Sequence, residues 1–155
     1  MDKSVNINLS NLVINQLGYL YKDAEKQAKV METKYNIPKF AVLDNQVNKI
    51  KYRGKDSEIV VKIVFSRFLN KQIELIQWIE GDCIFKEFIE SGQEGLHHFG
   101  IFVEDLQSYI DYFNSNGFEI IHSGNIGKQY FVYIDSLESF GIYLEFQETL
   151  KRRKK

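Results

Sequence analysis

Four polar side chains lie in stretches of sequence that are otherwise apolar and β-forming, and all four are of types that bind metal ions. They are Gln16, Glu74, His98 and Glu145. Together they supply one imidazole nitrogen, two carboxylates and one amide oxygen, which would leave coordination positions for water or substrate on a divalent cation. Because burying a carboxylate is costly unless it is paired or bound to a metal, the four residues form a candidate metal site if the fold brings them together.

An internal repeat gives a reason to expect that they meet. The segment that begins at Gln16 aligns with the segment that begins at His98, and in both copies a glycine follows two positions later and an aspartate seven positions later. The segments around Glu74 and Glu145 also align, with the glutamate in the same place. Two related modules packed side by side would bring the four matched positions to one cavity.

Each of these residues also has a plainer explanation when it is taken alone. Glu74 and Glu145 alternate with apolar neighbours, and such side chains can face solvent on a sheet with one exposed side. His98 could be a hydrogen-bonded histidine of the core. His97 is expected to face away from His98 in a structural or supporting role, and His122 to lie at a strand edge without a partner. The match between the two copies favours a shared site over these separate explanations.

The periodicity of the apolar residues predicts the elements that would position these side chains. Strands are expected at residues 13–21, 40–43, 58–69, 72–79, 96–103, 118–122, 129–135 and 141–147, and helices at 24–35, 82–90 and 105–116. The polar segment 44–55 is predicted to be a loop, with turns at Gly124, Gly127 and 136–139. The order is strand, helix and three strands, then a connecting helix, then strand, helix and three strands again.

Length and composition are typical of one folded domain. The chain has 155 residues, of which 44% are hydrophobic and 26% charged, and this balance excludes a wholly disordered chain. We expect a single domain over residues 1–155, with module one at about 12–80, the connecting helix at about 82–91, module two at about 95–148 and a basic tail at 149–155.

The charge balance and the cysteine count exclude several classes of protein. Twenty Lys and Arg against 21 Asp and Glu give a formal net charge of −1, which argues against binding of nucleic acid. The single cysteine, Cys83, excludes a disulfide within the chain and a cysteine-based zinc finger. No segment reaches the roughly 18 apolar residues of a membrane span, and the polar N-terminus lacks the apolar region of a signal peptide. We therefore expect a cytoplasmic protein that binds neither membrane nor nucleic acid.

The four candidate ligands and the segments around them resemble the vicinal oxygen chelate superfamily, which includes glyoxalase I, methylmalonyl-CoA epimerase, the extradiol dioxygenases, and the bleomycin and fosfomycin resistance proteins. The resemblance covers residues 13–147 and is strongest to the epimerase and glyoxalase-like branch. Residues 73–100 carry most of it, with Ile-Glu-Leu, a helix that ends in Phe-Ile-Glu, and then Gly-Leu-His-His. Residues 36–40 resemble the segment that ends the first helix in that branch.

The resemblance implies an α+β fold in which two tandem βαβββ modules form a curved mixed sheet around a metal-binding cavity. It also implies that Gln16, Glu74, His98 and Glu145 hold one divalent metal ion. The first ligand is often histidine in the family. An amide oxygen in that place shifts the preference toward Mn²⁺, Mg²⁺ or Co²⁺, with Ni²⁺ and Zn²⁺ as further candidates.

The function implied by the resemblance is metal-dependent proton transfer next to a carbonyl, by an isomerase, epimerase or lyase acting on a small acyl thioester or hemithioacetal. In glyoxalase-like members the glutamate of the last strand serves as ligand and base, so Glu145 is the first candidate for the base and Glu74 the second. A CoA thioester would need cations near its phosphates, and Lys62, Arg67 and Lys128 are candidates by residue type only. A homodimer is a reasonable expectation for such modules.

Two alternative functions stay open from the residues. An extradiol dioxygenase is less favoured, because that chemistry uses two histidines and one carboxylate on Fe(II), whereas the candidate set here has one histidine and two carboxylates. A non-catalytic binder of small molecules, as among the drug-resistance proteins, would use a pocket of aromatic side chains that stack on a flat ligand. The aromatic residues considered for such a pocket are Phe40, Tyr52, Trp78, Tyr130 and Tyr133.

Overall fold

The structure of the protein is a computed structural model that describes residues 7–126 and 128–148. The predicted pattern of a strand, a helix and three strands occurs in it twice. Gly127 and the predicted basic tail at 149–155 lie outside the described residues. In chain order the elements are the 3₁₀ turn η1 (Leu9–Asn11), β1 (Gln16–Leu20), α1 (Ala24–Tyr35), β2 (Ala41–Tyr52), β3 (Lys55–Phe68), β4 (Lys71–Glu80), α2 (Ile84–Glu90), β5 (Gly95–Val103), α3 (Leu106–Ser115), β6 (Ile120–Ile126), β7 (Gln129–Ile134), α4 (Leu137–Phe140) and β8 (Tyr143–Glu148).

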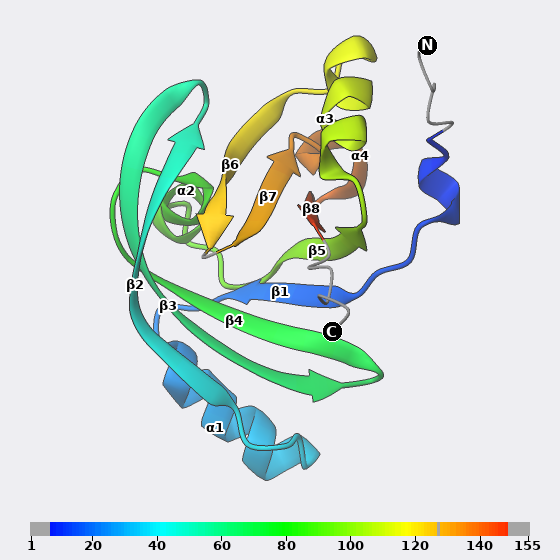
Figure 1. The fold of residues 1–155 in the computed structure, drawn as a ribbon. Helices are drawn as coiled ribbons and strands as arrows, with labels where there is room; N and C mark the ends of the chain where they lie inside the picture. The colour runs from blue at the N-terminus through cyan, green and yellow to red at the C-terminus, as the bar shows by residue number, and fades with distance from the viewer. Residues whose placement is uncertain (1–6, 127, 149–155) are drawn as a thin grey trace, which may run out of the picture.

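The strands form one closed barrel in the order β1-β4-β3-β2-β6-β7-β8-β5 (Figure 1). In each module the first strand is parallel to the last, as β1 is to β4 and β5 is to β8, and the other neighbours are antiparallel. The modules join through the antiparallel pair β1–β5 and through a short pairing of residues 50–52 of β2 with residues 122–124 of β6. This mixed sheet of two βαβββ modules confirms the predicted fold class.

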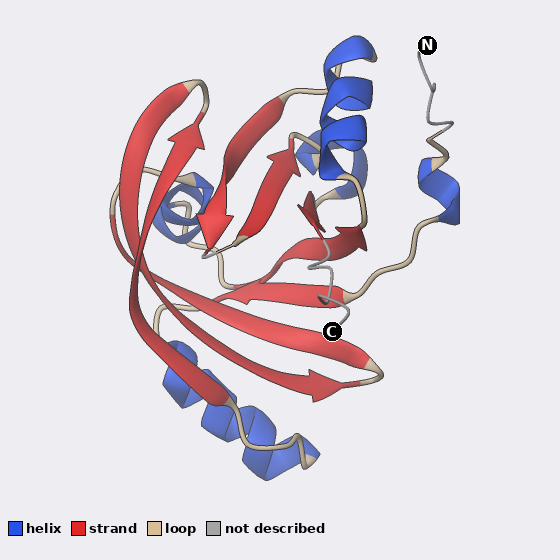
Figure 2. Ribbon diagram, in the orientation of Figure 1, coloured by secondary structure: helices blue, strands red, loops and turns tan. Residues whose placement is uncertain are grey.

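Equivalent helices cover the outside of the barrel in the two modules (Figure 2). Asp23 caps α1 by accepting a hydrogen bond from the backbone of Lys26, and Asp105 caps α3 in the same way through Ser108. α1 packs its alanines on the outer face of β3 and β4, while α3 packs on β7 and β8. No helix among the described residues combines the length and the apolar character needed to cross a bilayer.

The inner face of the barrel holds a separate apolar core. Branched aliphatic side chains at alternate positions of β3 meet Ile76, Phe131 and Tyr133 there, and Ile84 and Phe85 of α2 extend the same core. Because side chains alternate between the two faces of a strand, the residues of β3 between these positions pack outward under α1 or face solvent. The barrel therefore has an apolar interior around β3, next to β4, the strand that carries Glu74.

The prediction of a loop over residues 44–55 is wrong, because residues 41–52 form the long strand β2. Nearly all of β2 is exposed on both faces, and only Asn48 and Ile50 are buried, so its sequence lacks the alternation of a half-buried strand. Two turn predictions also need correction. Gly124 lies inside β6, where it pairs with residues of β2 and β7, and residues 137–140 form the short helix α4.

Candidate metal and substrate site

The two copies of the repeat meet at the centre of the barrel through β1 and β5. Their antiparallel pairing places Gln16 opposite Gly100 and Gly18 opposite His98. A Cβ atom at Gly100 would lie 2.6 Å from the Gln16 side-chain oxygen, and one at Gly18 would overlap the His98 ring. The glycine that follows the polar residue in each copy therefore provides the space for the polar side chain of the other copy.

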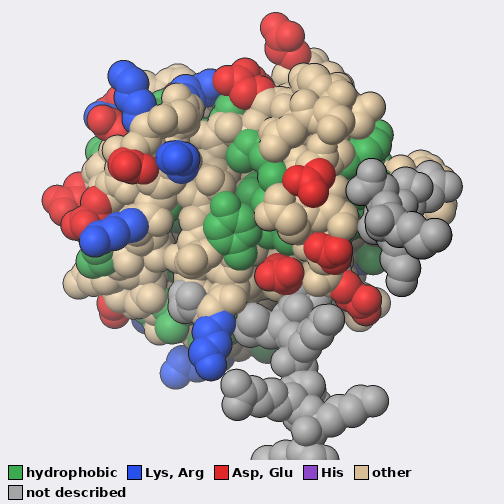
Figure 3. Space-filling view, turned by 45° about the horizontal axis from the view of Figure 1, so that its top comes forward, with side chains coloured by type: hydrophobic (Ala, Val, Ile, Leu, Met, Phe, Trp, Pro, Cys, Tyr) green, Lys and Arg blue, Asp and Glu red, His purple; other side chains and the backbone are tan. Residues whose placement is uncertain are grey.

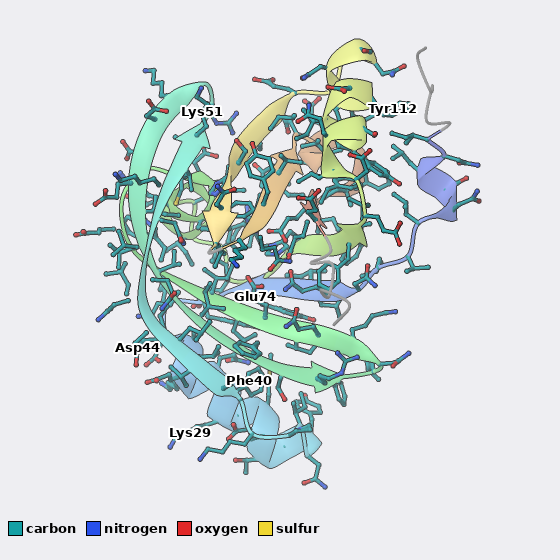
Figure 4. All side chains as sticks on the ribbon, in the orientation of Figure 1. Lys29, Phe40, Asp44, Lys51, Glu74 and Tyr112 are labelled. Atoms are coloured by element: carbon teal, nitrogen blue, oxygen red, sulfur yellow. The ribbon has the colours of Figure 1, made fainter. Side chains whose placement is uncertain are left out.

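The two glutamates flank this pair of strands. Glu74 of β4 is in register with Gly18, and Glu145 of β8 is in register with Gly100. Glu74 lies near the middle of the barrel, where β1 and β4 run side by side (Figure 4). Both side chains face the same interior cavity as Gln16. The structure thus brings three of the four predicted ligands to one place.

Hydrogen bonds through the amide groups connect the two carboxyl groups. The Gln16 amide nitrogen donates to Glu74 Oε2 at 2.6 Å and to Gln72 Oε1 at 2.9 Å. The Gln147 amide nitrogen donates to Gln16 Oε1 at 3.2 Å and also to Glu145. Gln16 is therefore the link between the first and the second module at this site.

Three glutamines of this network were not among the predicted site residues. Gln72 and Gln147 each lie two positions from a predicted glutamate and so point to the same face of their strands, which is a signal that the sequence contains. Gln129 of β7 donates to Gln147 Oε1 at 2.7 Å. Only the pairing of β7 with β8 brings Gln129 there, and no motif marks it in the sequence.

His98, the fourth predicted ligand, is fully buried beside the cavity and is not part of its lining. Its ring packs over Gly18 and stands edge-on to Tyr133, with 5.1 Å between ring centroids. His98 Nδ1 lies 3.0 Å from His97 Nδ1, and His98 Nε2 has no hydrogen-bond partner. A histidine that binds a metal ion needs a nitrogen with a free lone pair, and His98 Nε2 meets this requirement.

The prediction that His97 faces away from His98 is wrong. The pairing of β1 with β5 shifts register after Gly18, so that Tyr19 pairs with Leu96 and the residue between is a β-bulge. The bulge turns His97 inward, where it packs on Phe85 and Phe88. Because only one of the two Nδ1 atoms can donate the hydrogen bond, the neutral rings carry their protons on different nitrogens.

His122 is not at a strand edge, as predicted, but in the interior, where it lines the cavity. It packs against Phe85, Phe131 and Tyr133, and neither ring nitrogen has a hydrogen-bond partner. Burial lowers the pKa of His122 and of His98 to about 3, and it lowers the pKa of His97 well below its usual value. All three histidines of the chain are therefore neutral in the folded protein near pH 7.

We expect the buried, neutral His122 to make the protein sensitive to acid. Its stabilising contribution is complete above the unfolded pKa of about 6.5 and is lost as the pH falls from there toward the folded pKa. Replacing His122 by Leu should make the loss of unfolding free energy below pH 6 smaller by about 1.4 kcal/mol per pH unit. Urea unfolding of both proteins between pH 7 and 4 measures this difference, and parallel curves would contradict the prediction.

No described cation at the site pairs with the two carboxyl groups, so their ionised forms are costly. Burial raises the pKa of Glu74, and the negative charge of Glu145 raises it further. Burial also raises the pKa of Glu145, while hydrogen bonds from Tyr133 and Gln147 oppose the increase. A divalent cation held by both carboxylates would remove this cost.

The four donors suit a divalent cation by their chemistry, although their side chains are not grouped around one point in this structure. Among the described residues, no three His, Cys, Asp or Glu side chains are grouped so that they could hold a metal ion by themselves. A cation here would depend on the Gln16 oxygen beside Glu74 and Glu145, with His98 Nε2 as the buried nitrogen nearby. Two carboxylates and an amide oxygen suit oxygen-preferring cations. The metal assignment remains a prediction that these observations support.

The cavity between these polar groups and the β3 side of the barrel has a volume of about 330 Å³, within the range of small-molecule sites. Of the aromatic residues considered for a stacking pocket, Tyr133 lines it. Phe40 packs under α1, and the Tyr52 hydroxyl donates to Glu87 instead. The remaining two, Trp78 and Tyr130, are not part of the cavity lining.

Comparisons with known proteins agree with this architecture. The sequence profile described as the glyoxalase/bleomycin resistance protein/dioxygenase superfamily matches residues 15–133. No curated protein sequence matches the chain significantly. At the identities found, the similarity to solved structures concerns the fold.

Three of the similar solved structures illustrate the match. A hypothetical protein from Bacillus halodurans C-125 is 18% identical with a TM-score of 0.66, covering 92% of this chain and 98% of its own. A Streptomyces coelicolor methylmalonyl-CoA epimerase variant in complex with 2-nitronate-propionyl-CoA is 12% identical with a TM-score of 0.66, covering 93% and 99%. Methylmalonyl-CoA epimerase from Mycobacterium tuberculosis is 14% identical with a TM-score of 0.64, covering 97% of each chain. With its two βαβββ modules and a profile match over most of its length, the chain belongs to the glyoxalase/bleomycin resistance protein/dioxygenase superfamily, the vicinal oxygen chelate superfamily that its sequence resembles.

Proposed function

We propose that the protein is a divalent-metal-dependent enzyme that moves a proton next to a carbonyl group, as an epimerase, isomerase or glyoxalase-type lyase. The observation that carries the proposal is the pair of buried carboxyl groups, Glu74 and Glu145, which face one apolar cavity and are joined through Gln16. Paired, buried carboxyl groups are suited to holding and moving protons.

Gln16, Glu74, His98 and Glu145 would hold the metal ion. When bound, it would stabilise negative charge that develops on a substrate oxygen. Glu145 is the proposed base, because its carboxyl group is buried and faces the cavity. The Tyr133 hydroxyl and the Gln147 amide, which both hydrogen bond to Glu145, orient this carboxylate toward the cavity. Glu74 is the second candidate, on the opposite side of Gln16.

Solvent exchange tests the reaction directly. The protein is loaded with Mn²⁺ or Co²⁺ and incubated in D₂O with small acyl thioesters and hemithioacetals, and deuterium uptake next to the carbonyl is followed by NMR. Uptake with wild type but not with Glu145→Gln supports the proposal. Metal binding without exchange on any substrate would instead favour the second candidate function, a non-catalytic binder of small molecules. The many apolar residues that line the cavity support this second candidate.

His97 is expected to act through His98 as a positioning residue. For His98 Nε2 to keep a free lone pair, its proton must sit on Nδ1 and be donated to His97 Nδ1. Replacing His97 by Phe, which suits its aromatic surroundings, should weaken Mn²⁺ binding about tenfold. Nitrogen-15 NMR of the metal-free wild type should show opposite tautomers for the two rings. Equal tautomers, or an unchanged affinity in His97→Phe, would contradict this role.

A further inference from the structure

We propose that the barrel cavity takes an uncharged, mainly apolar ligand whose oxygen-bearing end lies toward the two glutamates. Ligands whose buried part bears a carboxylate or a phosphate are excluded from it. The position of the ligand oxygens rests on the proposed function. The neutral, apolar character of the ligand rests only on what lines the cavity.

A large part of the cavity wall is apolar and suits an apolar ligand body. It consists of alternate side chains of β3, together with apolar residues of β4, α2, β5 and β7: Ile59, Val61, Ile63, Phe65, Ile76, Phe85, Phe102 and Phe131. Most of these side chains are packed in the inner core, so their shape is fixed before a ligand enters. Such a wall gains binding free energy by removing apolar ligand surface from water.

The polar part of the cavity wall lies among these apolar residues and offers neutral groups around the two carboxyl groups. Gln72, Gln129 and Gln147 line it beside Glu74 and Glu145. Their amides are connected in one network through Gln16. Amide groups donate to and accept from hydroxyl and carbonyl groups of a ligand without adding charge. This wall is therefore matched to the polar end of an uncharged molecule.

The described part of the cavity lining offers no cationic side chain to an anion. Among its described lining residues there is no lysine or arginine. Lys62, one of the cations considered for a phosphate, is ion-paired with Glu25 and Asp44 instead, and Arg67 and Lys128 are exposed and do not line the cavity.

A bound divalent cation would not make the cavity favourable for an anionic ligand. Its two positive charges would be matched by Glu74 and Glu145, so a carboxylate or phosphate on the ligand would bring unpaired negative charge into an apolar cavity. Methylmalonyl-CoA, the substrate named for an epimerase of similar fold, carries such a carboxylate next to its thioester. We therefore do not expect it to be the substrate of this chain.

Mandelamide and mandelate test the proposal as a matched pair. They share a phenyl ring and two adjacent oxygens, and they differ only in having a carboxamide or a carboxylate. Calorimetric titrations at pH 8, without metal and with Mn²⁺, should give at least about tenfold tighter binding of mandelamide. Equal binding, tighter binding of mandelate, or failure of mandelamide to bind under both conditions would overturn the proposal.

A cation introduced into the lining provides the reverse test. Leu43 lines the cavity and is 41% exposed, so Leu43→Arg can place a guanidinium at the cavity while keeping contact with water. This variant should bind mandelate about tenfold more tightly than wild type. Val47→Arg is the matched control, because Val47 lies on the same strand, is 61% exposed and does not line the cavity. An equal gain in both variants, or none in Leu43→Arg, would count against the proposal.

These titrations are independent of the proposed reaction. The metal-free arm requires neither a bound cation nor turnover. If exchange in D₂O fails while mandelamide still binds in preference to mandelate, the reaction is wrong and the ligand class stands. If exchange succeeds while mandelate binds as well as mandelamide, the ligand class is wrong and the reaction stands.

Discussion

Replacing Glu145 by Gln is expected to lower the affinity for Mn²⁺ or Co²⁺ by about 100-fold, because a neutral amide oxygen replaces a charged carboxylate ligand. The substitution also removes the proposed base, so deuterium uptake next to a substrate carbonyl should stop. The fold should be kept, because glutamine has the same shape and the buried charge is costly without a metal. The free Mn²⁺ signal in electron paramagnetic resonance measures the affinity.

Glu148→Gln provides the control for this substitution. Glu148 is the last residue of the same strand, three positions from Glu145, and therefore on the opposite face. It makes no contribution to the cavity lining, so its neutralisation should leave metal affinity and exchange within about twofold of wild type. Loss of binding in both variants would point to a general charge effect, and unchanged binding in Glu145→Gln would reject Glu145 as a ligand.

A methyl group at Gly18 is expected to cost about 3 kcal/mol or more of unfolding free energy. Its Cβ would overlap the ring of His98, which is fully buried and cannot move aside. For a chain of this length the midpoint of thermal unfolding should fall by about 6–12 °C. Gly18→Ala and the wild type are compared by calorimetry. The same argument predicts a loss in Gly100→Ala, where the new Cβ would meet the Gln16 side chain.

Double variants test whether each glycine of the repeat makes room for the polar side chain of the other copy. If the cost of Gly18→Ala arises from His98, then the double variant with His98→Ala should be more stable than the sum of the two single changes implies, by about 1–3 kcal/mol. Gly100→Ala should be rescued in the same manner by Gln16→Ala. Crossed combinations, such as Gly18→Ala with Gln16→Ala, should show no such coupling. Additive effects in the matched pairs would contradict the account of these glycines.

The sequence allowed the fold class to be predicted, and its local patterns also marked Gln16, Glu74 and Glu145, which the structure brings to one cavity. The repeat is visible as a polar residue followed by glycine in both copies, and the structure explains that spacing through the pairing of Gln16 with Gly100 and of Gly18 with His98. Glu74 and Glu145 alternate with apolar residues, and this period-two pattern correctly indicated that they point away from their neighbours into one face.

Other features depend on tertiary contacts that no local pattern encodes. The sequence of β2 lacks the alternation of apolar and polar residues that indicates a strand, because both of its faces are largely exposed. The inward position of His97 depends on a bulge in the pairing of β1 with β5, and alternation along one strand predicts the opposite side. His122 appeared isolated in the sequence, but closing of the barrel between β2 and β6 places it in the interior.

Figure 3 shows charged side chains scattered around apolar ones on one face, and no histidine is visible there.

The central claim is that Gln16, Glu74, His98 and Glu145 form one divalent-cation site, and a calorimetric titration of the wild-type protein tests it most directly. Mn²⁺, Co²⁺, Mg²⁺, Ni²⁺ and Zn²⁺ are titrated in turn into metal-free protein at pH 7.5. The account predicts one ion per chain, with release of protons by the two buried carboxyl groups as the ion binds. Absence of binding for all five cations, in protein whose thermal unfolding shows an intact fold, would contradict it.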